Sequence, residues 1–208
     1  GLAYADRVTT VSETYAEEIQ TDFYGENLNS HLWYHRKKLS GIVNGIDVEQ
    51  WDSSVDPLLP APYDRSSVLE NKWKNKVELQ RRLGLTEDAG RFVVGLVSRL
   101  TDQKGLDLVD TIFQRMLDEH TQVVILGTGD PRYEGAFRYF ENEYRGQVSA
   151  CIMYDESLAH LIYGGADALL VPSLFEPCGL TQLIAMRYGT VPIVRETGGL
   201  KDTRSEEH

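Results

Sequence analysis

The sequence is poor in cysteine and has no long hydrophobic run. Its 208 residues include two cysteines, Cys151 and Cys178, and neither belongs to a Cys-x-x-Cys pair or to a metal-ligand pattern. This usage favours a reduced, cytoplasmic setting. No apolar stretch approaches the roughly 20 residues that cross a bilayer, so we expect no membrane partner.

Basic residues are also scarce. The chain holds 21 Lys and Arg against 32 Asp and Glu, a net charge of −11, and this balance disfavours nucleic acid as a partner. An acidic chain that binds an anionic ligand must gather its cations locally. Lys and Arg residues near the ends of predicted strands therefore carry more weight than usual.

Several catalytic signatures are missing. The sequence has no Gly-x-x-x-x-Gly-Lys-Ser/Thr loop, no His-Glu-x-x-His and no Gly-x-Ser-x-Gly. His31 and His35 have helical spacing but lack a third ligand, so a surface pair is the better interpretation. We therefore expect neither a metal ion nor a cofactor.

What the chain does contain is a regular alternation of apolar strands and helices. Strands are predicted at 92–97, 123–126, 148–153, 168–171 and 191–194, with helices at 71–83, 106–117, 133–144, 157–163 and 180–188. The alternation predicts an α/β fold, a Rossmann-like parallel sheet with helices on both faces. Upstream, we expect strands at 6–11 and 39–43, a helix at 13–21 and a proline-rich irregular segment at 52–64.

Ligands of parallel sheets sit beyond the carboxyl ends of the strands. Arg99 and Lys104 follow the strand at 92–97, where a planar guanidinium and a compact ammonium can meet one diphosphate. Taken alone, such a segment is more often a solvated loop.

Weaker signals follow other strands. Gly127 and Gly129 let the backbone approach a ligand, although a plain tight turn explains them as well, and the third glycine of a dinucleotide fingerprint is absent. Tyr154 can stack on a nucleobase, but a tyrosine is more often a rim or core residue. Asn44, beside Gly45, on its own indicates an ordinary turn.

The strongest signal is Phe-Glu-Pro-Cys-Gly-Leu-Thr-Gln at 175–182, between a predicted buried strand and a predicted helix. Gly179 at the mouth of the helix leaves backbone N–H groups free to bind phosphate. Glu176, three residues earlier, can accept hydrogen bonds from sugar hydroxyls. Strand, carboxylate, glycine and helix together predict a nucleotide-sugar site.

These segments resemble bacterial glycogen synthases and plant starch synthases. The resemblance rests on 97–108, Val-Ser-Arg-Leu-Thr-Asp-Gln-Lys-Gly-Leu-Asp-Leu, and on 175–182. It extends to Asn-Gly-Ile-Asp at 44–47 followed by Trp51, to Gly-Gly-Ala-Asp at 164–167 and to Thr-Gly-Gly-Leu at 197–200. The segments occur in matching order along the chain.

The resemblance implies the C-terminal donor domain of a truncated GT-B glycosyltransferase, which moves glucose from ADP-glucose to the non-reducing end of an α-1,4-glucan with retention. It implies that 1–21 end the N-terminal acceptor domain, that 22–63 form the linker and domain crossing with the first donor strand, and that 64–203 bind the nucleotide sugar. We interpret 204–208 as a cloning remnant. With the acceptor domain absent, we expect the fragment alone to be inactive.

The same resemblance implies roles for the candidate residues. Arg99 and Lys104 would grip the diphosphate, and Glu176 would hold the glucosyl hydroxyls. Tyr154 would lie against the adenine, and Asn44 would face the transferred glucose. The distal phosphate and sugar would be bound by the backbone around Cys178, Gly179, Leu180 and Thr181.

One departure and two alternatives accompany this interpretation. Related retaining enzymes often carry a second Glu eight residues after the first, where this chain has Ile184, so only Glu176 carries over. A non-catalytic nucleotide-binding or regulatory module is one alternative, and the sequence of an acceptor half would decide it. A sugar-nucleotide epimerase of the same architecture is the other, and the motif at 178–181 argues against it. No residue sets a preference for ADP over UDP.

Overall fold

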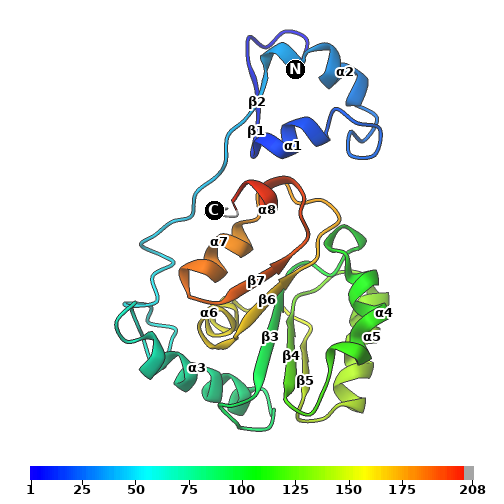
Figure 1. Cartoon of the computed structure of the whole chain (residues 1–208). Helices are drawn as coiled ribbons and strands as arrows, with labels where there is room; N and C mark the ends of the chain where they lie inside the picture. Colours follow the sequence, from blue (N-terminus) through cyan, green and yellow to red (C-terminus); the bar gives the residue numbers. More distant parts are fainter. Residues whose placement is uncertain (204–208) are drawn as a thin grey trace.

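The computed structural model describes residues 1–203, and its centre is a five-stranded parallel sheet (Figure 1). The strand order is β5-β4-β3-β6-β7. The strands are β3 (Phe92–Val97), β4 (Thr121–Leu126), β5 (Val148–Cys151), β6 (Ala168–Val171) and β7 (Val191–Val194). Each lies within two residues of a predicted apolar run, which confirms the parallel α/β sheet.

Helices cover both faces of this sheet. One hydrophobic cluster joins it to α4 (Leu106–Met116) and α5 (Pro131–Glu143). A second cluster joins it to α3 (Val68–Arg82), α6 (Glu156–Gly165) and α7 (Leu180–Arg187). Val93 and Val94 belong to different clusters, because successive side chains of a strand point to opposite faces.

The order of the strands reverses beside β3. The chain runs from β3 through β4 to β5 on one side and then returns to β6 on the other side of β3. In open α/β sheets, ligands bind at such a switch point, beyond the carboxyl ends of the strands. Since β3 and β6 are parallel neighbours, the loops that carry Arg99 and Glu176 leave the sheet side by side.

A smaller unit precedes the sheet. It contains β1 (Val8–Thr10), α1 (Glu13–Glu18), α2 (Asn29–Tyr34), a 3-10 turn at Arg36–Lys38 and β2 (Leu39–Gly41). In Figure 1 this unit lies apart from the five-stranded sheet, and residues 42–50 connect it to Trp51 without helix or strand.

One prediction about this unit was wrong. We expected 39–43 to supply the first strand of the donor sheet, but β2 pairs in parallel with β1 instead. Gly41 gives the physical reason, because a Cβ there would lie 2.1 Å from the carbonyl oxygen of Ser12. Glycine thus lets β2 approach the start of α1 closely. The domain limits at 21 and 63 stay predictions.

A short helix, α8 (Gly198–Asp202), ties the small unit to the rest. The Asp202 carboxylate accepts hydrogen bonds from the backbone N–H and the hydroxyl of Thr14, at 2.7 and 2.5 Å. Glu18 Oε1 accepts from the Thr197 hydroxyl and the Gly198 N–H, at 2.9 and 3.0 Å. The sequence had predicted only a glycine turn here.

Two further outcomes concern the sequence predictions. Within residues 1–203, no helix has the length and apolar character needed to cross a membrane. Residues 204–208, which we interpret as a cloning remnant, lie outside the described residues.

Candidate active site

The loops after β3 and β6 are fastened to each other. The Leu174 N–H donates to the Gln103 carbonyl at 2.9 Å. Gly105 has a φ of +65°, and a Cβ there would lie 2.1 Å from the carbonyl oxygen of Pro172. Only glycine combines this backbone conformation with so close an approach. The predicted phosphate-binding loop is thereby held against the predicted sugar-binding loop.

Lys104 and Glu176 meet at this contact. Lys104 Nζ lies 2.5 Å from Glu176 Oε2, and the Ser173 hydroxyl donates to the same oxygen at 2.9 Å. The two charged side chains are only 17% and 13% exposed, so salt and water screen their attraction less than that of a surface pair. Two residues that the sequence assigns to one ligand therefore contact each other directly.

The start of α7 lies in the same loop. Gly179 is the N-cap with a φ of +76°, and no side chain caps the helix. The first N–H groups of a helix have no partner within it, so those of Leu180 and Thr181 face outward with the positive end of the helix dipole. This is the geometry of an anion site. Cys178 and Thr181 are partly buried, whereas Leu180 is exposed.

A second glycine turn supports this loop from behind. The Gly199 N–H donates to the Glu176 carbonyl at 2.8 Å. A Cβ on Gly199 would lie 2.3 Å from the Cys178 carbonyl, and one on Gly198 would lie 2.2 Å from the Glu176 carbonyl. The turn therefore fixes the backbone of the loop that carries Glu176.

A cavity of about 410 Å³ opens at the carboxyl ends of β3, β4 and β5. Three predicted site residues line it: Arg99, Gly127 and Tyr154. Tyr154 is 89% exposed. A smaller cavity shares Val97 and Ser98 with the first and is also lined by Lys104 and Thr181. Arg99 and Lys104 therefore line two neighbouring cavities.

The glycines after β4 have a structural explanation. A Cβ on Gly127 would lie 1.8 Å from the Ser98 carbonyl, and one on Gly129 would lie 2.3 Å from the Leu100 carbonyl. The Leu100 N–H also donates to the Thr128 carbonyl at 2.9 Å. These glycines admit the backbone of the Arg99 loop, and their contact with a ligand stays a prediction.

Asn44 is one of the predicted residues that do not line the cavity beside Arg99. It is exposed in the connecting segment and does not line the space beside Arg99. Trp51, just after this segment, does line that space, and no role was predicted for it from the sequence. Ile184, at the position of the missing second Glu, is 7% exposed and forms an apolar part of the wall.

Tyr163 supplies a polar group to this wall. Burial raises the pKa of its phenol to about 12. At neutral pH the phenol keeps its proton, so it can donate a hydrogen bond but cannot act as a base.

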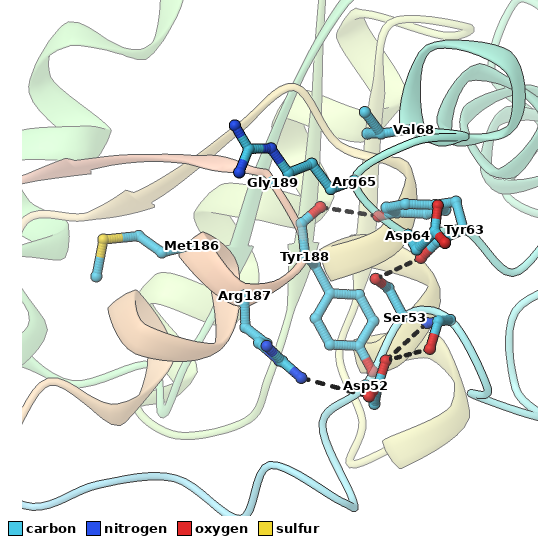
Figure 2. Close-up of a pocket in the computed structure, with 11 residues that line it drawn as sticks. Asp52, Ser53, Tyr63, Asp64, Arg65, Val68, Met186, Arg187, Tyr188 and Gly189 are labelled. Carbon is cyan, nitrogen blue, oxygen red and sulfur yellow. Dashed lines mark hydrogen bonds and ion pairs between the residues drawn. The ribbon is translucent and has the colours of Figure 1, made fainter.

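A second cavity, of about 480 Å³, lies at the other end of α7 (Figure 2). Figure 2 shows Arg187 reaching toward Asp52, at 3.3 Å. Hydrogen bonds from Ser66 and Ser67 hold the pKa of the Asp64 carboxyl at about 2, so this acid is charged but already engaged. None of the predicted site residues lines this cavity, so the switch-point cavity is the candidate site.

The chain belongs to the group 1 glycosyltransferase family. The model described as "Glycosyl transferases group 1" matches residues 80–208, which include the Arg99–Lys104 loop and the 175–182 motif. The model described as "Starch synthase catalytic domain" matches residues 1–34.

Curated relatives are named glycogen synthase, which confirms the resemblance. One from Lachnospira eligens is 59% identical over 203 residues, and one from Bacillus cereus is 51% identical over 203 residues. Both alignments cover 98% of this chain and 42% of the relative, so the chain spans less than half the length of these proteins. Their names give no support to the regulatory-module or epimerase alternatives.

Solved structures are also similar. The catalytic domain of starch synthase IV from Arabidopsis thaliana, bound to ADP and acarbose, has a TM-score of 0.91 and 40% identity, over 100% of this chain and 43% of that one. Anabaena HepE, in complex with UDP and glucose, has a TM-score of 0.63 and 16% identity, over 98% and 48% of the two chains. The second likeness shows the fold alone.

Proposed function

We propose that this chain is the donor-binding part of a cytoplasmic, retaining glycosyltransferase that moves glucose from ADP-glucose to the non-reducing end of an α-1,4-glucan. One observation carries the proposal. A cation, a carboxylate and a helix start meet in one pair of loops at the switch point of the sheet, where Lys104 contacts Glu176 beside Gly179.

Each part of the donor has a matching group. Arg99 and Lys104 offer positive charge to the diphosphate, and the start of α7 offers backbone N–H groups to its distal phosphate. Glu176 engages Lys104 and Ser173 through Oε2, which leaves Oε1 for the glucosyl hydroxyls. Tyr154 offers an exposed ring to the adenine.

The chemistry follows from these groups. The bond between the anomeric carbon and the phosphate oxygen breaks, and the acceptor oxygen forms a new bond to that carbon on the same face. The acceptor proton passes to the departing phosphate, so no protein nucleophile is required. Arg99, Lys104 and the helix start oppose the charge that develops on the leaving group, and the loss of one such donor costs about 10²–10³ in rate.

The acceptor side of the cleft would come from a further domain, since the chain spans 42% of its curated relatives. We therefore expect the chain alone to bind ADP without elongating a glucan. We retain the α-1,4-glucan as the partner of the complete enzyme.

Isothermal titration with ADP tests the proposal. The Arg99→Ala, Lys104→Ala double variant should lose at least about tenfold in affinity, because two charge-assisted contacts disappear. The Lys74→Ala, Arg138→Ala double variant is the matched control, since it also removes two positive charges but from the exposed faces of α3 and α5. Equal affinity for the parent and the first variant would reject the phosphate roles.

A further inference from the structure

Trp51 occupies a position that the proposed roles do not use. It belongs to the segment that follows the connector, yet it lines the cavity beside Arg99 and Tyr154. Its indole stacks on the imidazole of His160, with ring centroids 4.2 Å apart and planes 18° apart. The Tyr163 ring meets it edge-on at 5.6 Å.

A buried carboxylate holds His160 in turn. His160 Nδ1 lies 2.7 Å from Asp56 Oδ2, and the two side chains are 4% and 1% exposed. A carboxylate only accepts, so Nδ1 carries the hydrogen of this bond. The Asp56 carboxylate also accepts from the Tyr188 hydroxyl at 2.6 Å and from the Leu58 N–H at 2.9 Å.

The Tyr188 hydroxyl keeps its proton and acts only as a hydrogen-bond donor to Asp56. Burial and the hydrogen bond to Asp56 raise the pKa of Tyr188, so its proton stays in place at neutral pH. Three hydrogen-bond donors compensate the cost of burying the Asp56 charge. Removal of one donor would leave part of that desolvation cost without compensation. The network therefore keeps the His160 ring in one orientation.

The backbone of Trp51 is fixed as well. Its N–H donates to the Asp47 carbonyl at 3.0 Å, and its carbonyl accepts from the Arg187 guanidinium at 3.3 Å. The neighbouring Gln50 amide donates to Glu156 Oε1 at 3.4 Å, and both residues line the cavity. The backbone hydrogen bonds and the ring contacts together fix the position of the indole at the cavity wall.

We propose that Trp51 contacts the nucleobase of the bound donor, and that His160 and Asp56 are positioning residues that hold its indole. The inference rests on the proposed function, because it presumes a nucleotide in this cavity. An indole offers a flat, rigid surface to a purine at little cost in side-chain entropy, and base stacking on an aromatic side chain is sequence-tolerant but strong. Tyr154 and Trp51 would then both contribute aromatic surface to the base.

Calorimetry with two probes tests the inference on the 208-residue chain. ADP carries the nucleobase, whereas inorganic pyrophosphate carries only the charged part. Trp51→Ala and His160→Ala should each bind ADP about tenfold more weakly than the parent. Their affinity for pyrophosphate should equal that of the parent. Trp51→Phe keeps a flat ring and should retain most of the ADP affinity. Trp73→Ala removes an indole that is 47% exposed on α3 and should leave both affinities unchanged.

Fluorescence supplies a second readout. In a chain with Trp33→Phe and Trp73→Phe, Trp51 is the sole indole, and its emission should change with ADP but not with pyrophosphate. Parent-like ADP affinity in both alanine variants would overturn the inference. An equal loss for ADP and pyrophosphate would also overturn it, since that result indicates only structural damage.

The controls separate this inference from the proposed function. If the Arg99→Ala, Lys104→Ala variant loses ADP affinity while Trp51→Ala does not, only the role of Trp51 fails. If the parent chain does not bind ADP, the proposed function fails and the inference fails with it.

Discussion

Lys104 and Glu176 are 72 residues apart in the sequence and 2.5 Å apart in the structure. The Glu176 carboxylate thus neutralises the same ammonium that a diphosphate would bind. Each charge serves as the other's partner, which offsets the cost of their partial burial. If Lys104 binds the diphosphate as we propose, Glu176 and the diphosphate compete for one cation.

This competition predicts the effect of Glu176→Gln. The variant should bind ADP a few-fold more tightly than the parent, because Lys104 no longer has an anionic neighbour. It should gain less affinity, or lose some, for ADP-glucose, because the carboxylate that we propose as the acceptor for the sugar hydroxyls is gone. Titration with both ligands measures the two effects. Glu119→Gln, at a side chain that is 85% exposed, is the control, and weaker ADP binding by Glu176→Gln would contradict the competition.

Gly105 and Gly84 form a matched pair for the loop contact. Their φ values are +65° and +66°, but only Gly105 has a neighbour where a Cβ would go, the Pro172 carbonyl oxygen at 2.1 Å. Gly84→Ala should cost about 1 kcal/mol of unfolding free energy from backbone strain alone. Gly105→Ala should cost about 2 kcal/mol more, because the two loops must separate, and it should also weaken ADP binding. Denaturant unfolding measures both costs, and equal losses would contradict the steric argument.

The sheet was readable from the sequence because its strands are continuous apolar runs. The limits of β3, β6 and β7 match the predictions residue for residue. The convergence of Lys104 and Glu176 followed from one rule, since parallel neighbouring strands deliver their loops to one edge. That the two side chains pair directly depends on rotamers and on Gly105, which no spacing encodes.

Other features depend on contacts that periodicity does not report. β2 has three residues, too few to indicate whether its partner is β1 or β3. α8 begins with two glycines, which weaken any helical pattern. His160 and Asp56 are separated by 104 residues. The pairing of His160 with Asp56 and its stacking on Trp51 therefore could not be predicted from the local sequence.

Lys72 predicts a pH dependence of stability. Its ammonium donates to the Tyr188 and Gly164 carbonyls at 3.1 and 3.2 Å, and burial lowers its pKa from 10.5 to about 7. Between these values the unfolded chain binds this proton and the folded chain does not, so the free energy of unfolding should rise with pH from about 7 to 10.5. Below about pH 7 both states carry the proton, and the slope from Lys72 ends.

Comparison with Lys72→Met isolates this effect. The variant has no titrating group at the site, so the difference in unfolding free energy, parent minus variant, should grow as the pH increases from about 7 toward 10. Urea unfolding at pH of about 6.5, 8 and 9.5 measures it. Lys74→Met, at an exposed neighbouring position of α3, should show a constant difference. If the difference in unfolding free energy for Lys72→Met also stays constant with pH, the lowered pKa of Lys72 is contradicted.

The hydrogen bonds that Asp202 and Glu18 make between α8 and α1 join segments more than 170 residues apart. The connector at 42–50 would by itself let the small unit swivel, but α1 cannot turn without breaking these bonds or pulling α8 along. The turn at Gly198 and Gly199 leads into α8 and also braces the backbone of Glu176. A rotation of the small unit would therefore act, through α8, on the backbone of Glu176, which the Gly199 N–H contacts directly.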